Sequence, residues 1–199
     1  MGPYLIATKG DISKAIDLYE WNSEIAARLL RCIGIFEVTF RNKVSRAMEE
    51  NLKLEKGEMW FEYSHLGIEL SQQLRNAKKS ARKEVFPVTV ESIVNNTTFG
   101  FWRFVFNKKS FVHIWLPFLG KAIGSSNPEN REEFDEMRIG FERLIDLRNI
   151  AAHHGPLINI DLMDELENLF YMISRLSPVI AESTIRRSRI LQLIEKRPI

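Results

Sequence analysis

Apolar residues recur at helical spacing from residue 12 to about residue 52, and this periodicity constrains the fold more than any other feature of the chain. The repeating positions are Ile16, Tyr19, Ala26, Leu29, Leu30, Ile33, Phe36, Val38, Phe40, Val44 and Met48. Asp11 is a suitable N-cap in front of this stretch, and Gly34 is the one weak point inside it. The pattern predicts one long helix, or two helices in near-continuity.

The rest of the chain also reads as helix, and alternation typical of strands is scarce. Proline, glycine and capping residues divide it into segments. The predicted helices are about 69–84, 90–94 after the cap Thr89, 128–153 or 154 after the cap Asn127, 161–176, and 178–196 after the cap Ser177. We therefore expect an all-α helical bundle that forms a single domain over residues 1–199.

Three further segments have less regular patterns. Residues 54–67, "LEKGEMWFEYSHLG", contain two glycines and are predicted to form a loop. The segments "TTFGFWRFVF" and "SFVHIWLPFLGKAI" are apolar and aromatic, and we expect them to fill the core as helices or turns. Base stacking on these rings is the alternative, but a stripe this apolar is more often core.

Composition narrows the class of protein. The chain has 199 residues, 45% of them hydrophobic and 27% charged, as in an ordinary globular protein. Its one cysteine, Cys32, excludes a disulfide framework or a cysteine metal cluster. The N-terminus lacks the pattern of a signal peptide, and no apolar run is long enough to span a bilayer. We expect a cytoplasmic protein that does not bind membranes.

Charge is segregated along the chain although the net charge is only +2. Between residues 71 and 110 there are eight basic and two acidic residues, a local net charge of +6. The predicted basic helix carries Arg75, Lys78, Lys79, Arg82 and Lys83. These residues are candidates for following an RNA backbone, and ordinary solvation of a helix face is an equally good interpretation.

The segment "LRNIAAHHGP", residues 147–156, places an arginine, an asparagine and two histidines at a predicted helix end. Asn149 and His153 are four residues apart and share a face, and the long side chain of Arg148 can reach the same side. A histidine can exchange protons with a substrate near neutral pH, and arginine donors match the geometry of phosphate. Together they supply what RNA cleavage without a metal requires, and the sequence offers no convincing metal site. His154 is either a helper in this chemistry or a helix-end residue.

Spacing alone does not decide between these interpretations, but three segments carry a resemblance. "LRNIAAHH" resembles the R-N-x-x-A-H-H signature of HEPN-type ribonucleases, in particular the Abi-like family of bacterial abortive-infection proteins. Residues 18–44 are similar to the family's Y-x-W-N helix and to its E-V-x-x-R-N element at Glu37-Val38 and Arg41-Asn42. Residues 98–106, "TFGFWRFVF", are similar to its F-G-F-W box.

The resemblance implies a HEPN helical domain that acts on RNA in phage defence or in a toxin–antitoxin system. It also implies that two motifs face each other across a dimer, so this chain is expected to be a homodimer. Each subunit would contribute Arg148, Asn149 and His153, with His154 as a possible helper, and the products would carry 2′,3′-cyclic phosphates. A neutralising antitoxin or a regulatory RNA is a possible further partner. Two positions depart from the family pattern, since Gly155 stands where Glu is common and Ile150 where a basic residue is common.

Two alternatives stay open at this point. The chain could be a non-catalytic RNA-binding or regulatory protein that has kept the HEPN fold and motif. Arg41 and Asn42 lie on an otherwise apolar helix with Glu37 one turn before them, which favours a structural ion pair over a role in orienting the motif helix.

Overall fold

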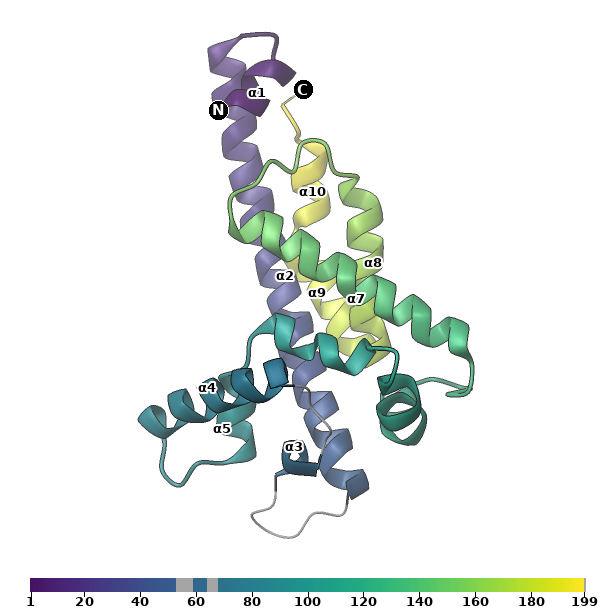
Figure 1. Cartoon of the computed structure of the whole chain (residues 1–199). Coiled ribbons are helices and arrows are strands. Elements are labelled where there is room, and N and C mark those ends of the chain that lie inside the picture. The colour runs from purple at the N-terminus through teal and green to yellow at the C-terminus, as the bar shows by residue number, and fades with distance from the viewer. Residues whose placement is uncertain (53–58, 64–67, 199) are drawn as a thin grey trace. The chain divides into compact units, whose positions relative to one another are not determined.

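Every regular element is helical in a computed structural model of the chain, which describes residues 1–52, 59–63 and 68–198. No strand occurs in these ranges, so the prediction of an all-α fold is confirmed (Figure 1). None of the helices in the described ranges is long and apolar enough to cross a bilayer.

The first long periodic segment is one continuous helix, α2 (Ile12–Leu52). Asp11 caps it, because its Oδ1 accepts a hydrogen bond from the Lys14 N–H at 3.1 Å and its carbonyl accepts from the Ala15 N–H at 3.0 Å. Gly34 does not interrupt the helix. The alternative of two successive helices is therefore wrong.

Internal contacts divide the chain into two compact units. Unit 1 consists of residues 1–36 and 140–199, and unit 2 consists of residues 37–139. Two helices, α2 and α7 (Arg131–Ala152), contribute residues to both units. The prediction of a single domain over 1–199 stays a prediction.

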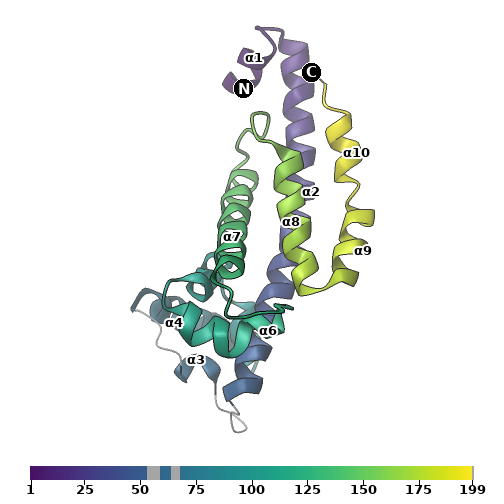
Figure 2. The same cartoon turned by 90° about the vertical axis from the view of Figure 1, so that its right-hand side faces the viewer.

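Unit 1 is built on the first part of α2 and on the second part of α7 (Figure 2). The other helices of this unit are α1 (Gly2–Ala7), α8 (Leu162–Leu176), α9 (Pro178–Ser188) and α10 (Ile190–Glu195). α8 and α9 lie side by side and meet at Ser177, which caps α9 as predicted. The Trp21 Nε1–H donates to the Leu193 carbonyl at 2.8 Å and ties α10 to α2.

The prediction of one helix over 178–196 is wrong, because the chain turns at Arg189. This residue has φ = 54°, in the left-handed region, and separates α9 from α10. Ser188 and Ile190 on either side of it are buried. Burial of these two neighbours requires a change of direction that a straight helix would not allow.

Unit 2 contains a core of aromatic side chains. Its other elements are α3 (Trp60–Tyr63), α4 (Ile68–Glu84), α5 (Val90–Asn95), the 3₁₀ helix η1 (Phe99–Phe106), the π-helix η2 (Phe111–Leu119) and α6 (Gly120–Ala122). The Trp60 ring lies 6.2 Å from Trp102 and 6.1 Å from Phe104 between centroids. The prediction that the F-G-F-W segment is core is confirmed, since Phe99, Phe101 and Trp102 are buried.

The predicted loop at 54–67 falls largely outside the described residues. Within it, α3 is helical, so the prediction is wrong for residues 60–63. Burial of Trp60, whose Nε1–H donates to the Ser45 Oγ at 3.0 Å, explains why this segment is ordered against α2.

The start of α7 also differs from the prediction. The helix begins at Arg131, three residues after Pro128, and its cap is Asn130. The Asn130 Oδ1 accepts from the Glu132 N–H at 2.9 Å, and the Asn130 carbonyl accepts from the Phe134 N–H at 3.4 Å. Asn127 instead closes the preceding turn by accepting from the Glu129 N–H at 3.2 Å.

Candidate active site

The C-terminal end of α7 is a Schellman turn built around His154. The Gly155 N–H donates to the Ile150 carbonyl at 2.8 Å, and the His154 N–H donates to the Ala151 carbonyl at 3.3 Å. His154 has φ = 55°, a left-handed conformation that helix ends usually reserve for glycine. The helix ends at Ala152, slightly before the predicted end at His153 or His154.

Four sequence-predicted site residues lie together at this end of unit 1. Asn149, His153 and His154 are exposed, and Arg148 is half-buried. The His153 N–H still donates to the Asn149 carbonyl at 3.0 Å, so these two residues keep the helical register that places them on one face. The Arg148 Nη1 lies 3.4 Å from the Asn149 Oδ1, so the guanidinium bends toward that face.

The two departures from the family pattern contact each other. A Cβ at Gly155 would lie 2.9 Å from the Ile150 Cγ2 and 3.1 Å from the Ile150 carbonyl oxygen. Any larger residue at position 155 would therefore displace Ile150 or open the turn. Gly155 and Ile150 therefore pack together in the turn that ends the helix at the two histidines.

A residue to which the sequence analysis gave no role, Asn22 of α2, holds the segment that follows the motif. Its side chain is buried, its Oδ1 accepts from the Leu157 N–H at 2.7 Å, and its Nδ2 donates to the Gly155 carbonyl at 3.3 Å. The sequence signal was present, since Asn22 is a polar residue on the apolar stripe that includes Leu18, Ile25 and Leu29.

The chain's C-terminal region holds the same segment from another side. The Arg197 Nη2 donates to the Ile158 carbonyl at 2.9 Å, and its guanidinium carbon lies 5.4 Å from the centroid of the Trp21 ring. Trp21 and Asn22, the last two residues of the Y-x-W-N motif, therefore both contribute to fixing the turn after His154.

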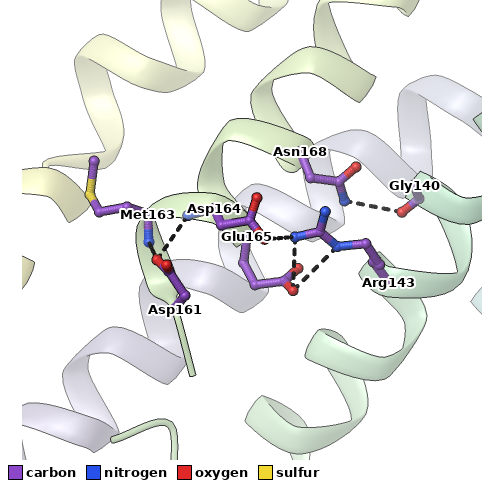
Figure 3. A network of polar contacts seen from close by, with 7 residues as sticks. All are labelled: Gly140, Arg143, Asp161, Met163, Asp164, Glu165 and Asn168. Carbon is purple, nitrogen blue, oxygen red and sulfur yellow. Dashed lines mark hydrogen bonds and ion pairs between the residues drawn. The ribbon is translucent and has the colours of Figure 1, made fainter. Parts of the chain in front are cut away.

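A polar network fixes α7 against α8 one to three turns before the motif (Figure 3). The Arg143 Nη2 donates to the Asp164 Oδ2 at 2.6 Å and lies 3.0 Å from the Glu165 Oε1. Burial alone would lower the pKa of Arg143, but the hydrogen bonds and charges of Glu165 and Asp164 outweigh it and raise the pKa. Arg143 therefore stays charged in this network.

A second contact at this level lets the two helices approach closely. The Asn168 Nδ2 donates to the Gly140 carbonyl at 3.1 Å (Figure 3). A Cβ at Gly140 would lie 2.8 Å from the Asn168 Oδ1 and 2.9 Å from the Met172 Sδ. The motif thus stands at the end of a helix that is anchored to α8 at Gly140 and Arg143.

The predicted RNA-binding residues lie in unit 2, on α4. Arg75, Lys79, Arg82 and Lys83 are exposed, whereas Lys78 is half-buried and pairs with Glu62, with Nζ and Oε1 3.1 Å apart. The structure therefore brings the motif residues together in one unit and the basic residues together in the other.

The E-V-x-x-R-N element makes a contact within unit 2. The Arg41 Nη2 donates to the Asn95 Oδ1 at 2.9 Å, which ties α2 to α5. This contact joins Arg41 to an amide of another helix, whereas the ion pair with Glu37 that the sequence favoured stays a prediction.

Comparison of the chain with protein-family models, with curated proteins and with solved structures finds no match. Among the described residues, no three His, Cys, Asp or Glu side chains gather closely enough to hold a metal ion.

Proposed function

We propose that this protein is a homodimeric endoribonuclease of the HEPN type that cleaves RNA without a metal, in phage defence or in a toxin–antitoxin system. The observation that carries the proposal is the end of α7. There, the half-buried Arg148 and the exposed Asn149 and His153 lie close together, and Asn22 holds the turn that follows them.

The proposed reaction is a transesterification within the RNA. The ribose 2′-oxygen attacks the adjacent phosphorus while its proton passes to a general base, and the bond from phosphorus to the 5′-oxygen breaks. The leaving 5′-oxygen takes a proton from a general acid, so the products are a 2′,3′-cyclic phosphate and a 5′-hydroxyl. Arg148 offsets the charge that develops on the phosphorane, and Asn149 positions the phosphate.

This chemistry needs a base and an acid on opposite sides of the phosphorus. One exposed His153 per chain supplies one of these groups. A second copy of the chain supplies the other if the two α7 ends face each other, which is the reason for proposing a composite site. His154 takes the left-handed position of the turn, and this structural role argues against its being the second acid or base.

Cleavage of total cellular RNA in excess EDTA tests the proposal. The wild type is compared with Arg148→Ala and His153→Ala, and His113→Ala is the matched control because His113 is also exposed but lies in η2. We expect cutting by the wild type and by His113→Ala, with cyclic phosphate ends, and at least a hundredfold loss in the other two variants.

The alternative is a non-catalytic RNA-binding or regulatory protein, and the exposed cations of α4 favour it because cations can bind RNA without any contribution from His153. Under this alternative no variant cuts RNA, and Lys79→Ala or Arg82→Ala lowers RNA affinity while His153→Ala does not. Cutting that survives in His153→Ala contradicts the proposed chemistry.

A further inference from the structure

The loop after α4 exposes an aromatic side chain beside the basic face of the helix. Phe86 is 92% exposed, more than any other large hydrophobic side chain in the part of the chain that the structure describes, and Val85 beside it is 43% exposed. A phenylalanine ring in water is unfavourable unless it has a partner for part of the time. Phe86 contributes nothing to the core of unit 2.

The cations of α4 form a stripe that leads to this ring. Arg75, Lys79 and Arg82 are spaced four and three residues apart, so they lie on one side of the helix, about 5–6 Å between successive Cβ atoms. Lys83 extends the stripe toward Phe86. None of Lys79, Arg82 and Lys83 forms an ion pair with another described residue.

The acid at the end of this helix is engaged elsewhere. The Asn96 Nδ2 donates to the Glu84 Oε2 at 2.9 Å, which directs the carboxylate toward α5. The stripe therefore presents positive charge with little local compensation.

The opposite face of α4 argues against a lipid surface as the ligand. Leu74, Ala77 and Ala81 form the apolar side of the helix, and all three are buried within the fold. A helix that lies on a membrane needs an exposed apolar face, whereas among the side chains that the structure describes here the exposed apolar ones, Val85 and Phe86, belong to the loop after the helix. A row of cations that ends at one exposed ring fits a flexible polyanion whose units carry flat aromatic faces.

We propose that Phe86 and the stripe of Arg75, Lys79, Arg82 and Lys83 form a binding site for single-stranded RNA. The cations contact successive phosphates, and one unpaired base stacks on the ring of Phe86. The choice of RNA as the polymer rests on the proposed function. Double-stranded RNA does not offer an unpaired base, so the site selects single strands.

Fluorescence of a Phe86→Trp variant tests the stacking directly. The four native tryptophans, Trp21, Trp60, Trp102 and Trp115, are at most 5% exposed. Acrylamide quenches exposed tryptophans far more than buried ones, so the emission that it quenches belongs to the new residue. The experiment uses full-length protein that also carries His153→Ala, to prevent cleavage, and a twelve-nucleotide oligouridylate. We expect the oligonucleotide to quench the new emission and a duplex of equal length to leave it unchanged.

Binding of the labelled oligonucleotide at several salt concentrations distinguishes the contribution of the Phe86 ring to the affinity from that of the cations. We expect Phe86→Ala to weaken binding about tenfold without changing the slope of log K against log salt. Lys79→Ala should reduce that slope by about 0.7. Val112→Ala is the matched control, because Val112 is an exposed apolar residue of η2 in the same unit, and it should bind like the wild type.

The outcomes distinguish this inference from the proposed function. Equal RNA affinity of Phe86→Ala and the wild type overturns the inference and leaves the proposed ribonuclease intact if the wild type cuts RNA. No binding and no cutting by the wild type overturns both. Emission that is altered by phosphatidylglycerol vesicles but not by the oligonucleotide overturns the inference in favour of a membrane site.

Discussion

Asn22 and Leu157 are joined by a 2.7 Å hydrogen bond from the Leu157 N–H to the Asn22 Oδ1, across 135 residues of sequence. Both residues are buried, so no solvent replaces this bond if it is lost. The bond links the Y-x-W-N helix to the turn that carries His153. Two of the three segments on which the family resemblance rests are therefore physically coupled within unit 1.

Replacing Asn22 should weaken both the fold and the proposed site. Asn22→Ala removes the acceptor for the Leu157 N–H and the donor for the Gly155 carbonyl, and we expect the free energy of unfolding to fall by about 2–3 kcal/mol. Ser23→Ala is the matched control, because the exposed Ser23 hydroxyl only donates to the Tyr19 carbonyl of its own helix. Urea denaturation measures both, and equal stability of the two variants would contradict the role of Asn22.

The same variant tests positioning if the protein cuts RNA. At a temperature at which Asn22→Ala is folded by circular dichroism, we expect kcat to fall at least tenfold while KM changes less than twofold. This split arises because the turn that orients His153 is loosened, whereas the basic residues of α4 are untouched. A change confined to KM would speak against positioning.

Position 154 offers a stabilising substitution. The left-handed conformation costs a non-glycine residue about 1–2 kcal/mol, and glycine avoids this cost. Glycine also loses more backbone entropy on folding, which offsets part of the stability gained by the substitution. We expect His154→Gly to raise the free energy of unfolding by roughly 0.5–1 kcal/mol and to leave cleavage unchanged. Destabilisation by this substitution would mean that the His154 side chain makes a contact that outweighs its backbone strain.

Lys9 is the internal reference for that measurement. It has φ = 52° at the end of α1, and the Gly10 N–H donates to the Leu5 carbonyl at 2.8 Å, as in the turn after α7. Lys9→Gly should therefore stabilise by a similar amount, and it tests the backbone argument at a place unrelated to the motif.

Two helix-interior glycines should respond to alanine with opposite signs. In α7, a Cβ at Gly140 would meet Asn168 and Met172 of α8 at less than 3 Å, so Gly140→Ala should cost about 1–3 kcal/mol. In α2, nothing lies within 4 Å of a Cβ at Gly34, so Gly34→Ala should stabilise by about 0.5–1 kcal/mol. Thermal or urea unfolding measures both. An unchanged free energy of unfolding for Gly140→Ala would mean that α8 can move away from α7 without a loss of stability.

Local signals predicted the long helices and several of their caps, but not the short helices α1 and α3. Asp11, Thr89 and Ser177 act within one turn of their own position, and the structure shows each of them capping a helix, as predicted. The start of α7 was missed because Asn127 and Asn130 are both good caps, and the local sequence does not choose between them. The break at Arg189 could not be predicted, because no glycine or proline marks it in the sequence. It lies between two buried residues, Ser188 and Ile190.

The candidate site also has a part that the sequence predicted and a part that it did not. Its chemistry-bearing residues, Arg148, Asn149 and His153, follow from spacing on one helix and from resemblance. The sequence marks Asn22 as a polar residue on an apolar stripe but does not reveal its partners, because these are 133 and 135 residues away. The exposure of Phe86 was likewise hidden, since a Phe-Pro pair after a helix reads the same whether the ring is buried or free.

The pH dependence of stability should show the effect of Asp135, which lies between two arginines of α7. Its carboxylate oxygens are 3.3 Å from the Arg131 Nε and 3.2 Å from the Arg138 Nε. Partial burial would raise the pKa of Asp135, but the hydrogen bonds and charges of Arg138 and Arg131 outweigh it and lower the pKa. A carboxyl with a lowered folded-state pKa stabilises the protein above its unfolded pKa of about 3.9, and this stabilisation is lost as the pH falls through the folded-state value.

Asp135→Asn should therefore be less stable than the wild type at pH 5–7, by a fraction of 1 kcal/mol because the pair is partly solvated. The difference should shrink toward zero as the pH falls through the lowered folded-state pKa of Asp135, because the wild-type carboxyl then also becomes neutral. Urea denaturation from pH 2.5 to 7 measures it, and Glu136→Gln provides the control for removing one exposed negative charge next to Asp135. A difference that persists unchanged at the lowest pH would show that Asp135 acts through shape and hydrogen bonding, because a neutral carboxyl has no charge left to lose.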